Sequence, residues 1–175
     1  MTEGTYFDRS ARSFELMTAA VAFYREARYD FAVISVQTSL ETYLELRTAE
    51  IVRWHDLGDV GDVISDRLVS KYTFLDGRFM ALWEALTGDG KAQVKAALGG
   101  SFEAYKAHTK VRNDVVHRGH HATREEAAAS LELGMSLLTY VQNTTAQVGE
   151  RLNKLEPIGS PGTNGGTNAS ESQST

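Results

Sequence analysis

The chain has 175 residues, of which 42% are hydrophobic and 23% charged, with a formal net charge of -5 and no cysteine. These values are typical of one globular domain, and without a run of about 18 apolar residues no membrane-spanning helix is expected. The lack of cysteine excludes disulfides, thiolate metal ligands and cysteine nucleophiles, and it favours a cytoplasmic protein. The negative charge argues against a protein that binds nucleic acid through a wholly basic surface.

Apolar residues at helical spacing predict two long helices in the first third of the chain. The first covers residues 6–28, where large apolar side chains recur at intervals of three, four and seven. Asp30 can cap a second helix that reaches about His55. The apolar stripe of this second helix consists of Val33, Val36, Leu40, Tyr43 and Leu44.

The middle of the chain is expected to form shorter helices. The stretch LGDVGDVISD, residues 57–66, interrupts the helical pattern with glycine and aspartate. Helical patterns then return around residues 63–72, 78–86 and 91–98. We therefore expect short connecting helices between the long ones.

Two further helices are predicted after Gly99 and Gly100. Ser101 can cap a helix that runs to Arg118, and Gly119 is placed to end it in a left-handed conformation. The pair Thr123 and Glu126 has the spacing of a capping box, in which each residue bonds the backbone of the other. This pair predicts the start of a last long helix that ends near residue 155.

Residues 156–175 differ from the rest of the chain. They contain both prolines and are rich in Gly, Ser, Thr and Asn, which predicts a disordered tail. No segment shows the strict alternation of a strand, so no sheet is expected. The sequence thus predicts an all-α fold: one domain over residues 1–155, built as an antiparallel, up-and-down bundle of about four to five main helices.

The segment RNDVVHRG, residues 112–119, combines side chains suited to phosphate chemistry. Arginine is permanently charged and binds phosphate oxygens with two donors, while histidine titrates near neutrality. The surrounding residues 101–121 carry four Lys and Arg against two acids, together with four of the five histidines. The same residues can also be structural, because basic side chains stabilise the C-terminal end of a helix.

Helical geometry separates the two main candidates for catalysis. Asn113 and His117 are four positions apart and share a face, whereas Arg112 lies about 140° around the axis from His117. One helix therefore cannot easily hold a phosphate between Arg112 and His117. Two copies that meet at a two-fold axis can, because each supplies what the other lacks.

These residues suit RNA cleavage without a metal ion. A neutral imidazole such as His117 can accept the proton of a ribose 2′-hydroxyl, and a second imidazole can protonate the leaving 5′ oxygen. Arg112 would stabilise the charge that develops on phosphorus, and Asn113 would orient the histidine or a phosphate oxygen. The need for a 2′-hydroxyl makes such a site selective for RNA.

Other sites are less well supported by the sequence. His117, His120 and His121 are separated by Gly119 and have no fixed acidic partner, so a metal site is not expected, and the loop histidines His120 and His121 are expected to flank the site or touch phosphate. Glu41 and Glu45 suggest a di-iron pair, but no histidine lies three positions after any glutamate. No glycine-rich phosphate-binding loop is present, so no cofactor is expected. The aromatic residues Phe79, Trp54, Trp83 and Tyr105 are expected in the core or at a dimer interface.

RNDVVHRG resembles the R-x4–6-H motif of the HEPN superfamily of all-α domains, which is often seen as RNxxxH followed by glycine. The segment ARYDFAVISVQTSLETYLELR, residues 27–47, is similar to the first core helix of that family. The resemblance covers roughly residues 14–150, and only the motif octet is specific. It implies a dimeric bundle whose two motif helices form a composite, metal-independent ribonuclease site.

By this resemblance, Arg112, Asn113 and His117 match the catalytic arginine, its polar neighbour and the catalytic histidine of the family. The resemblance also implies a helper acid on the preceding helix, for which Glu41 is the candidate. Lys110, Arg118, His120 and His121 are further accessory candidates because they belong to the basic stretch around the motif. The family implies an RNA substrate, a homodimer formed through the motif helix, and a toxin or phage-defence effector with a cognate antitoxin or regulatory partner. Other members have lost catalysis and bind nucleotides or act as scaffolds, which leaves a non-catalytic module as the alternative.

Overall fold

The computed structural model describes residues 3–57 and 72–155, with side chains from residue 11 to residue 154 outside the gap. These residues form helices and loops without a strand, which confirms the all-α class. Residues 63–71 of one expected short helix and the expected tail, residues 156–175, lie outside the described part of the chain. The helices are α1 (Glu3–Arg25), α2 (Tyr29–Trp54), α4 (Gly77–Thr87), α5 (Lys91–Ala97), α6 (Glu103–Arg118) and α7 (Arg124–Leu155).

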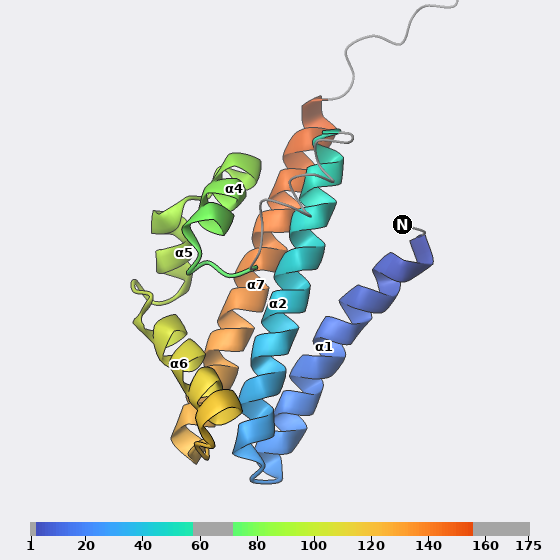
Figure 1. Ribbon diagram of the computed structural model, residues 1–175. Helices are drawn as coiled ribbons and strands as arrows, with labels where there is room; N and C mark the ends of the chain where they lie inside the picture. Colours follow the sequence, from blue (N-terminus) through green and yellow to red (C-terminus); the bar gives the residue numbers. More distant parts are fainter. Residues whose placement is uncertain (1–2, 58–71, 156–175) are drawn as a thin grey trace, which may run out of the picture.

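The four long helices, α1, α2, α6 and α7, alternate in direction along the chain (Figure 1). The pair α1 and α2 is antiparallel, and reciprocal bonds between the hydroxyl and carbonyl groups of Ser13 and Ser39 tie the two helices together. The central contact, however, joins α2 to α7, and these two helices run in the same direction. Val36 of α2 lies beside Gly134 near the start of α7, and Trp54 lies beside Gly149 near its end.

The bundle is therefore not antiparallel at every contact. The short helices α4 and α5 lie beside the upper half of the bundle, and α6 descends from them before α7 returns (Figure 1). This return brings α7 against α2 in parallel. Gly134 permits the close approach, because a Cβ atom there would lie 2.8 Å from Met17 Cε and 2.9 Å from Val36 Cγ1.

The hydrophobic core forms around α2, as its apolar stripe predicts. Each of the five stripe residues is at most 1% exposed: Val33, Val36, Leu40, Tyr43 and Leu44. A second part of the core holds Phe79, Trp83 and Tyr105, which are fully buried and confirm a core role for these aromatics. Trp54 is 40% exposed, because it lies at the C-terminal end of α2 and covers Gly149 with one edge.

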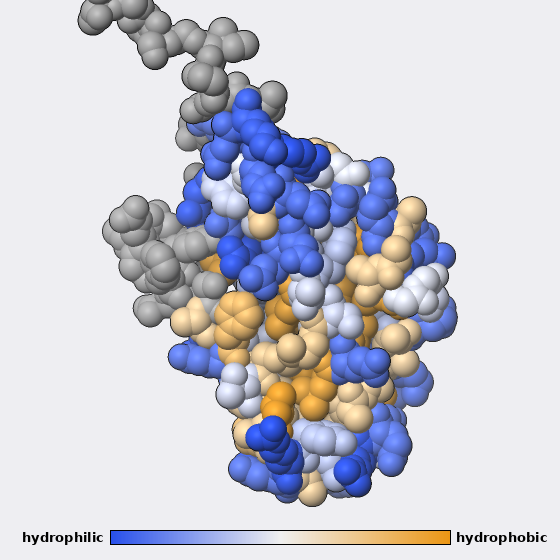
Figure 2. Space-filling view, turned by 180° about the vertical axis from the view of Figure 1, so that it is seen from behind, coloured by the Kyte–Doolittle hydropathy of each residue, from blue (hydrophilic) through white to orange (hydrophobic). Residues whose placement is uncertain are grey.

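Some hydrophobic side chains remain exposed on the described chain. They include Phe14, Phe31, Val116 and Met135. On the back face, hydrophobic residues gather in the middle and lower part, beneath a hydrophilic upper end (Figure 2). Single exposed hydrophobic residues are normal on a protein surface, whereas residues that gather on one face can form an interaction surface.

The ends of the helices follow the predicted capping residues in part. Gly119 ends α6 in the left-handed region, with φ of 68°, and the capping box is complete: Glu126 N donates to Thr123 Oγ1 at 3.2 Å, and Thr123 N donates to Glu126 Oε2 at 2.8 Å. Ser101 Oγ accepts a bond from Glu103 N at 3.3 Å, although the residue that directly precedes α6 is Phe102.

The prediction that Asp30 caps α2 is wrong. Arg28 precedes the helix, and Asp30 is already inside its first turn. Its carboxylate instead binds the loop that follows α6, which is described below. No helix within the described ranges has the length and apolar character needed to cross a bilayer.

Candidate functional site

The predicted motif lies on α6, which packs against α2 and α7 (Figure 1). The inner face of this helix carries Tyr105 and His108, both buried. Arg112 follows one turn after His108 and is half-buried, whereas Asn113 and His117 are exposed. The motif is therefore on a helix whose inner face is packed along its length, since Val111 and Val115 also contact a buried cluster, while its outer face leaves Asn113 and His117 accessible.

Arg112 and Asn113 lie side by side in the wall of a cleft of about 440 Å³. Arg112 Nη1 donates to Asn113 Oδ1 at 3.0 Å. Arg112 Nε is buried and has no hydrogen-bond partner among the described residues. Leaving a buried donor unpaired costs free energy, so the residues that the structure describes do not fully satisfy the guanidinium. The other residues that line the cleft are Gln37, Glu41, Thr73, Leu75, Asp76 and Thr109.

Glu41 is part of this cleft, as an accessory role for it requires. It lies on α2, and Gln37 Nε2, one turn earlier, donates to its Oε1 at 2.6 Å. A carboxylate and a guanidinium in one small cleft offer both acceptors and donors to a ligand. The cleft therefore suits a ligand that has both hydrogen-bond donors and anionic oxygens.

A buried line of polar side chains connects Glu41 to the core. Gln37 Oε1 lies 2.9 Å from His108 Nε2, and His108 Nδ1 lies 2.9 Å from Ser130 Oγ of α7. Because a carboxylate only accepts, Glu41 turns the amide nitrogen of Gln37 toward itself and leaves its oxygen for His108. That oxygen needs a proton on Nε2, so the neutral ring carries its hydrogen there. Ser130 Oγ then has one hydrogen for two acceptors, His108 Nδ1 and Glu126 O, which lies 2.8 Å away.

His108 is held in the neutral form. Burial lowers its pKa to about 4, and the nearby positive charge of Arg112 adds to this effect. His108 is 4% exposed, and its imidazole has two hydrogen-bond partners. Contacts with α2 and α7 therefore fix the orientation of the His108 ring, which lies next to Gln37 in the wall of the cleft.

His117 is not part of the cleft. It lies in the last turn of α6, exposed, and does not appear among the residues that line the hollow around Arg112. A single chain thus brings together Arg112, Asn113 and Glu41 but leaves His117 outside. The neighbouring Val116 is 44% exposed, so this end of the helix also presents an apolar side chain.

The accessory basic residues Lys110 and Arg118 share one acid. Lys110 Nζ lies 2.9 Å from Asp114 Oδ2, and Arg118 Nη1 lies 2.8 Å from Asp114 Oδ1. The hydrogen bond from Lys110 lowers the pKa of Asp114. Both cations are largely exposed and line a second hollow that shares Asn113 with the first. They are available beside the cleft rather than inside it.

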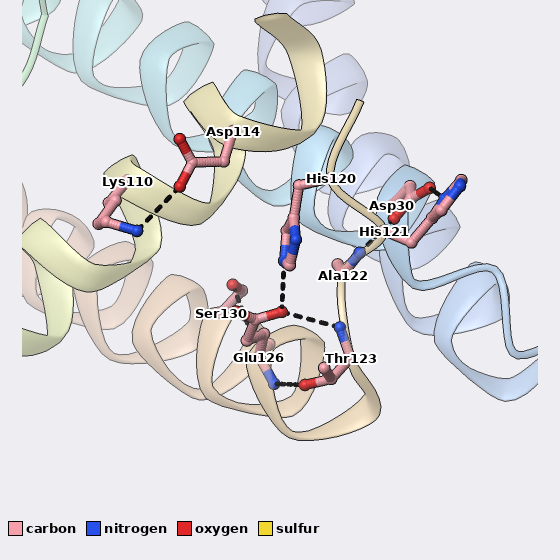
Figure 3. A network of polar contacts seen from close by, with 9 residues as sticks. All are labelled: Asp30, Lys110, Asp114, His120, His121, Ala122, Thr123, Glu126 and Ser130. Carbon is pink, nitrogen blue, oxygen red and sulfur yellow. Dashed lines mark hydrogen bonds and ion pairs between the residues drawn. The ribbon is translucent and has the colours of Figure 1, made fainter. Parts of the chain in front are cut away.

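His120 and His121 hold the loop between α6 and α7 (Figure 3). His120 Nε2 lies 3.0 Å from Glu126 Oε2, and His121 Nδ1 lies 3.0 Å from Asp30 Oδ2. Asp30 Oδ1 also accepts from Ala122 N at 2.6 Å. His120 is directed at α7 and His121 at α2, so the structure gives both histidines a role in fixing the loop that follows the motif helix. No group of three metal-ligating side chains occurs within the described ranges.

Replacing Asp30 by alanine is expected to lower the free energy of unfolding by about 1–2 kcal/mol, because it removes a charge-assisted bond to a backbone N–H and the His121 contact. Burial raises the pKa of Asp30, but the bonds from His121 and Ala122 lower it by more, so the carboxylate is ionised near neutral pH. Urea unfolding followed by circular dichroism measures the change. Glu15→Ala, which removes an exposed acid on α1, serves as control, and equal losses in both variants would contradict the assignment.

Sequence reasoning missed the line of Gln37, His108 and Ser130. His108 was visible only as one histidine of a basic stretch. A usable signal existed, since His108 is three positions after Tyr105 and four before Arg112, on the face that an amphipathic helix buries. Its partners are 71 and 22 positions away in sequence, so no local pattern could identify them.

The comparisons with known proteins leave the family of this chain open: no family model, curated protein or solved structure matches it.

Proposed function

We propose that this protein is a metal-independent endoribonuclease that acts as a homodimer, with a composite site of Arg112, Asn113 and His117. The observation that carries the proposal is the division of the motif: Arg112 and Asn113 line a cleft, whereas His117 is exposed one turn later. A two-fold contact between motif helices would place His117 of one subunit against the cleft of the other. The exposed Val116 gives such a contact an apolar component.

The proposed reaction forms a bond from the ribose 2′ oxygen to phosphorus and breaks the bond to the 5′ oxygen. The partner subunit's His117 accepts the 2′-hydroxyl proton, and the leaving 5′ oxygen takes a proton from water. Arg112 stabilises the negative charge on the phosphoryl oxygens, and Asn113 holds the guanidinium in place. The products are a 2′,3′-cyclic phosphate and a 5′-hydroxyl.

Glu41 has a positioning role in this proposal. Its carboxylate is fixed by Gln37 and lies in the same cleft as Arg112, where it can accept a bond from a ribose hydroxyl or orient the guanidinium. Within a cell, such an enzyme would act as a toxin or phage-defence effector, silenced by an antitoxin or another regulatory partner. The intact Arg–Asn–His motif supports this over a catalytically inactive relative.

Incubating the purified protein with RNA in EDTA, beside His117→Ala, is the direct test. We expect cleavage that resists EDTA and falls by about 100-fold or more in His117→Ala, the range for loss of a general acid or base. His55→Ala is the matched control, since it removes an imidazole at the far end of α2. Equal RNA decay in all three samples would identify a contaminating nuclease and contradict the proposal.

A non-catalytic binding or scaffolding module is the second candidate. The cleft favours it in one respect, because Arg112, Asn113 and Glu41 form a donor and acceptor set without His117. This alternative predicts no cleavage and a rise in melting temperature with a nucleotide. The rise would be lost in Arg112→Ala and kept in His117→Ala.

A further inference from the structure

Three hollows adjoin one another along the outer side of α6. The first, of about 320 Å³, lies between α5 and the start of α6; the second, of about 430 Å³, lies beside the middle of α6; the third is the Arg112 cleft of about 440 Å³. Leu75 lines all three, Lys106 joins the first to the second, and Thr109 and Asn113 join the second to the third. Because adjacent hollows share these lining residues, we treat the three as one surface, which we call the α5–α6 groove.

The α5–α6 groove collects positive charge on an acidic protein. Six of its lining residues are basic and four are acidic, whereas the whole chain carries a net charge of -5. The basic residues are Lys91, Lys95, Lys106, Lys110, Arg112 and Arg118, and the acids are Glu41, Asp76, Glu103 and Asp114. A local field of this sign attracts an anionic ligand.

Lys91 and Lys95 differ from Lys106, Lys110 and Arg118, each of which pairs with an acid. Both are exposed on α5, one turn apart, and neither forms an ion pair with a residue in the described ranges. Lys106 pairs with Glu103, and Lys110 with Asp114, but these are exposed pairs whose lysines can exchange the acid for a phosphate at little cost. The end of the groove farthest from Arg112 is therefore its least neutralised part.

The charge of the groove favours a nucleic acid over a protein partner. Of its large apolar residues, Phe74 and Phe102 are buried, whereas Leu75 is 36% exposed and lines all three hollows. The middle hollow therefore has a mainly apolar lining, as the centre of a protein interface can, and the excess of basic side chains along the groove is what selects a polyanion. Thr109 and Asn113 supply neutral hydrogen-bonding groups in the recess where the second and third hollows meet, as ribose and base edges require.

We propose that the α5–α6 groove holds a single-stranded RNA segment that extends from the Arg112 cleft, with Lys91 and Lys95 bound to phosphates distant from the cleaved bond. The inference rests on the proposed function for the identity of the ligand. A single strand fits because its bases can turn into the recess, whereas the paired bases of a duplex are stacked inside the helix and its phosphates would meet only the rim. The segment spans several nucleotides, so substrate length sets affinity.

The test measures binding rather than cleavage. Wild type and the double variant Lys91→Glu/Lys95→Glu are titrated into a fluorescein-labelled, single-stranded 2′-O-methyl RNA oligonucleotide, which lacks the nucleophilic hydroxyl. We expect at least a tenfold loss of affinity in the variant. The plot of log affinity against log salt should become less steep by about 0.7 for each lost phosphate contact.

The matched control is Arg12→Glu/Arg25→Glu on α1, which changes the net charge equally outside the groove. Like Lys95 on α5, Arg25 is in the last turn of its helix. Equal losses in both double variants would overturn the inference, since total charge would then explain binding. Polyglutamate that competes with the oligonucleotide at equal charge concentration would overturn it in favour of an acidic protein partner.

A second readout separates this inference from the proposed function. A dinucleotide substrate contains a single phosphodiester bond, so Lys91→Glu/Lys95→Glu should reduce its cleavage less than it reduces the cleavage of a longer RNA. If oligonucleotide affinity depends on Lys91 and Lys95 but no RNA is cleaved, the proposed RNA-binding groove is supported and the ribonuclease proposal is refuted. If the dinucleotide is cleaved but oligonucleotide affinity is the same in wild type and in the double variant, the ribonuclease proposal is supported and the proposed RNA-binding groove is refuted.

Discussion

Mixing the variants Arg112→Ala and His117→Ala, each inactive alone, is expected to restore RNA cleavage to about one quarter of the wild-type rate. If each site takes its arginine from one subunit and its histidine from the other, a mixed dimer holds one intact site and one that lacks both residues. Random exchange puts about half of the subunits into mixed dimers, and each of these has about half of the normal activity. Cleavage of a labelled RNA in EDTA measures the recovery.

The control for this experiment replaces one component by the double variant Arg112→Ala/His117→Ala. A mixture of the double variant with Arg112→Ala has no subunit that carries Arg112, so it should stay inactive. Subunit exchange is followed by energy transfer between labelled chains. An inactive mixture of the two single variants, in spite of demonstrated exchange, would mean that Arg112 and His117 act within one chain or not at all.

Local sequence patterns predicted the helices well, because a helix is defined by contacts within a few residues. The apolar stripe from Val33 to Leu44 is buried, Gly119 has the left-handed backbone expected of it, and Thr123 and Glu126 cap α7 reciprocally. Each of these features depends on residues at most four positions apart, or on the hydrophobic face of one helix. These three features could therefore be predicted from the sequence alone.

The failures of prediction have a common physical cause. Asp30 has the residue type of a helix cap, but its carboxylate binds a backbone N–H 92 positions away. Likewise, α2 packs against α7 in parallel because of the path of the chain through α4 and α5. The spacing of apolar residues predicts each helix but not the direction of the helices beside it. The catalytic assignment of Arg112, Asn113 and His117 stays a prediction, since it depends on a contact between two chains.

The line from Ser130 through His108 and Gln37 links the core of the bundle to Glu41 in the cleft. Its members come from α7, α6 and α2, so the line closes only when the three helices are packed. A carboxylate at the end of such a line is held at a fixed position, which a ligand-binding cleft needs. Damage to the line should therefore affect both stability and ligand binding.

Lowering the pH from about 6.5 to about 4 is expected to reduce the free energy of unfolding by about 3 kcal/mol through His108 alone. In the unfolded chain this histidine has its ordinary pKa of 6.5, whereas burial lowers the pKa to about 4 in the folded protein. Between these values the unfolded state binds a proton that the folded state does not, so acid favours unfolding. The full contribution is present above pH 6.5, and the loss amounts to about 1.4 kcal/mol per pH unit.

The charged groups nearest to His108 are Arg112 on its own helix and Glu41 beyond Gln37, and Ser130 on α7 is neutral. Asp30 and Glu126 have pKa values lowered from 3.8 and 4.5, so their contributions to stability decline only at lower pH. Urea unfolding at pH 7 and pH 5 should therefore show a pH dependence that His108→Gln removes. Because that variant can fold poorly, the carbon-bound ring protons of His108 are also followed by NMR in the wild type. A ring that titrates near pH 6.5 while the protein is folded would refute the assignment.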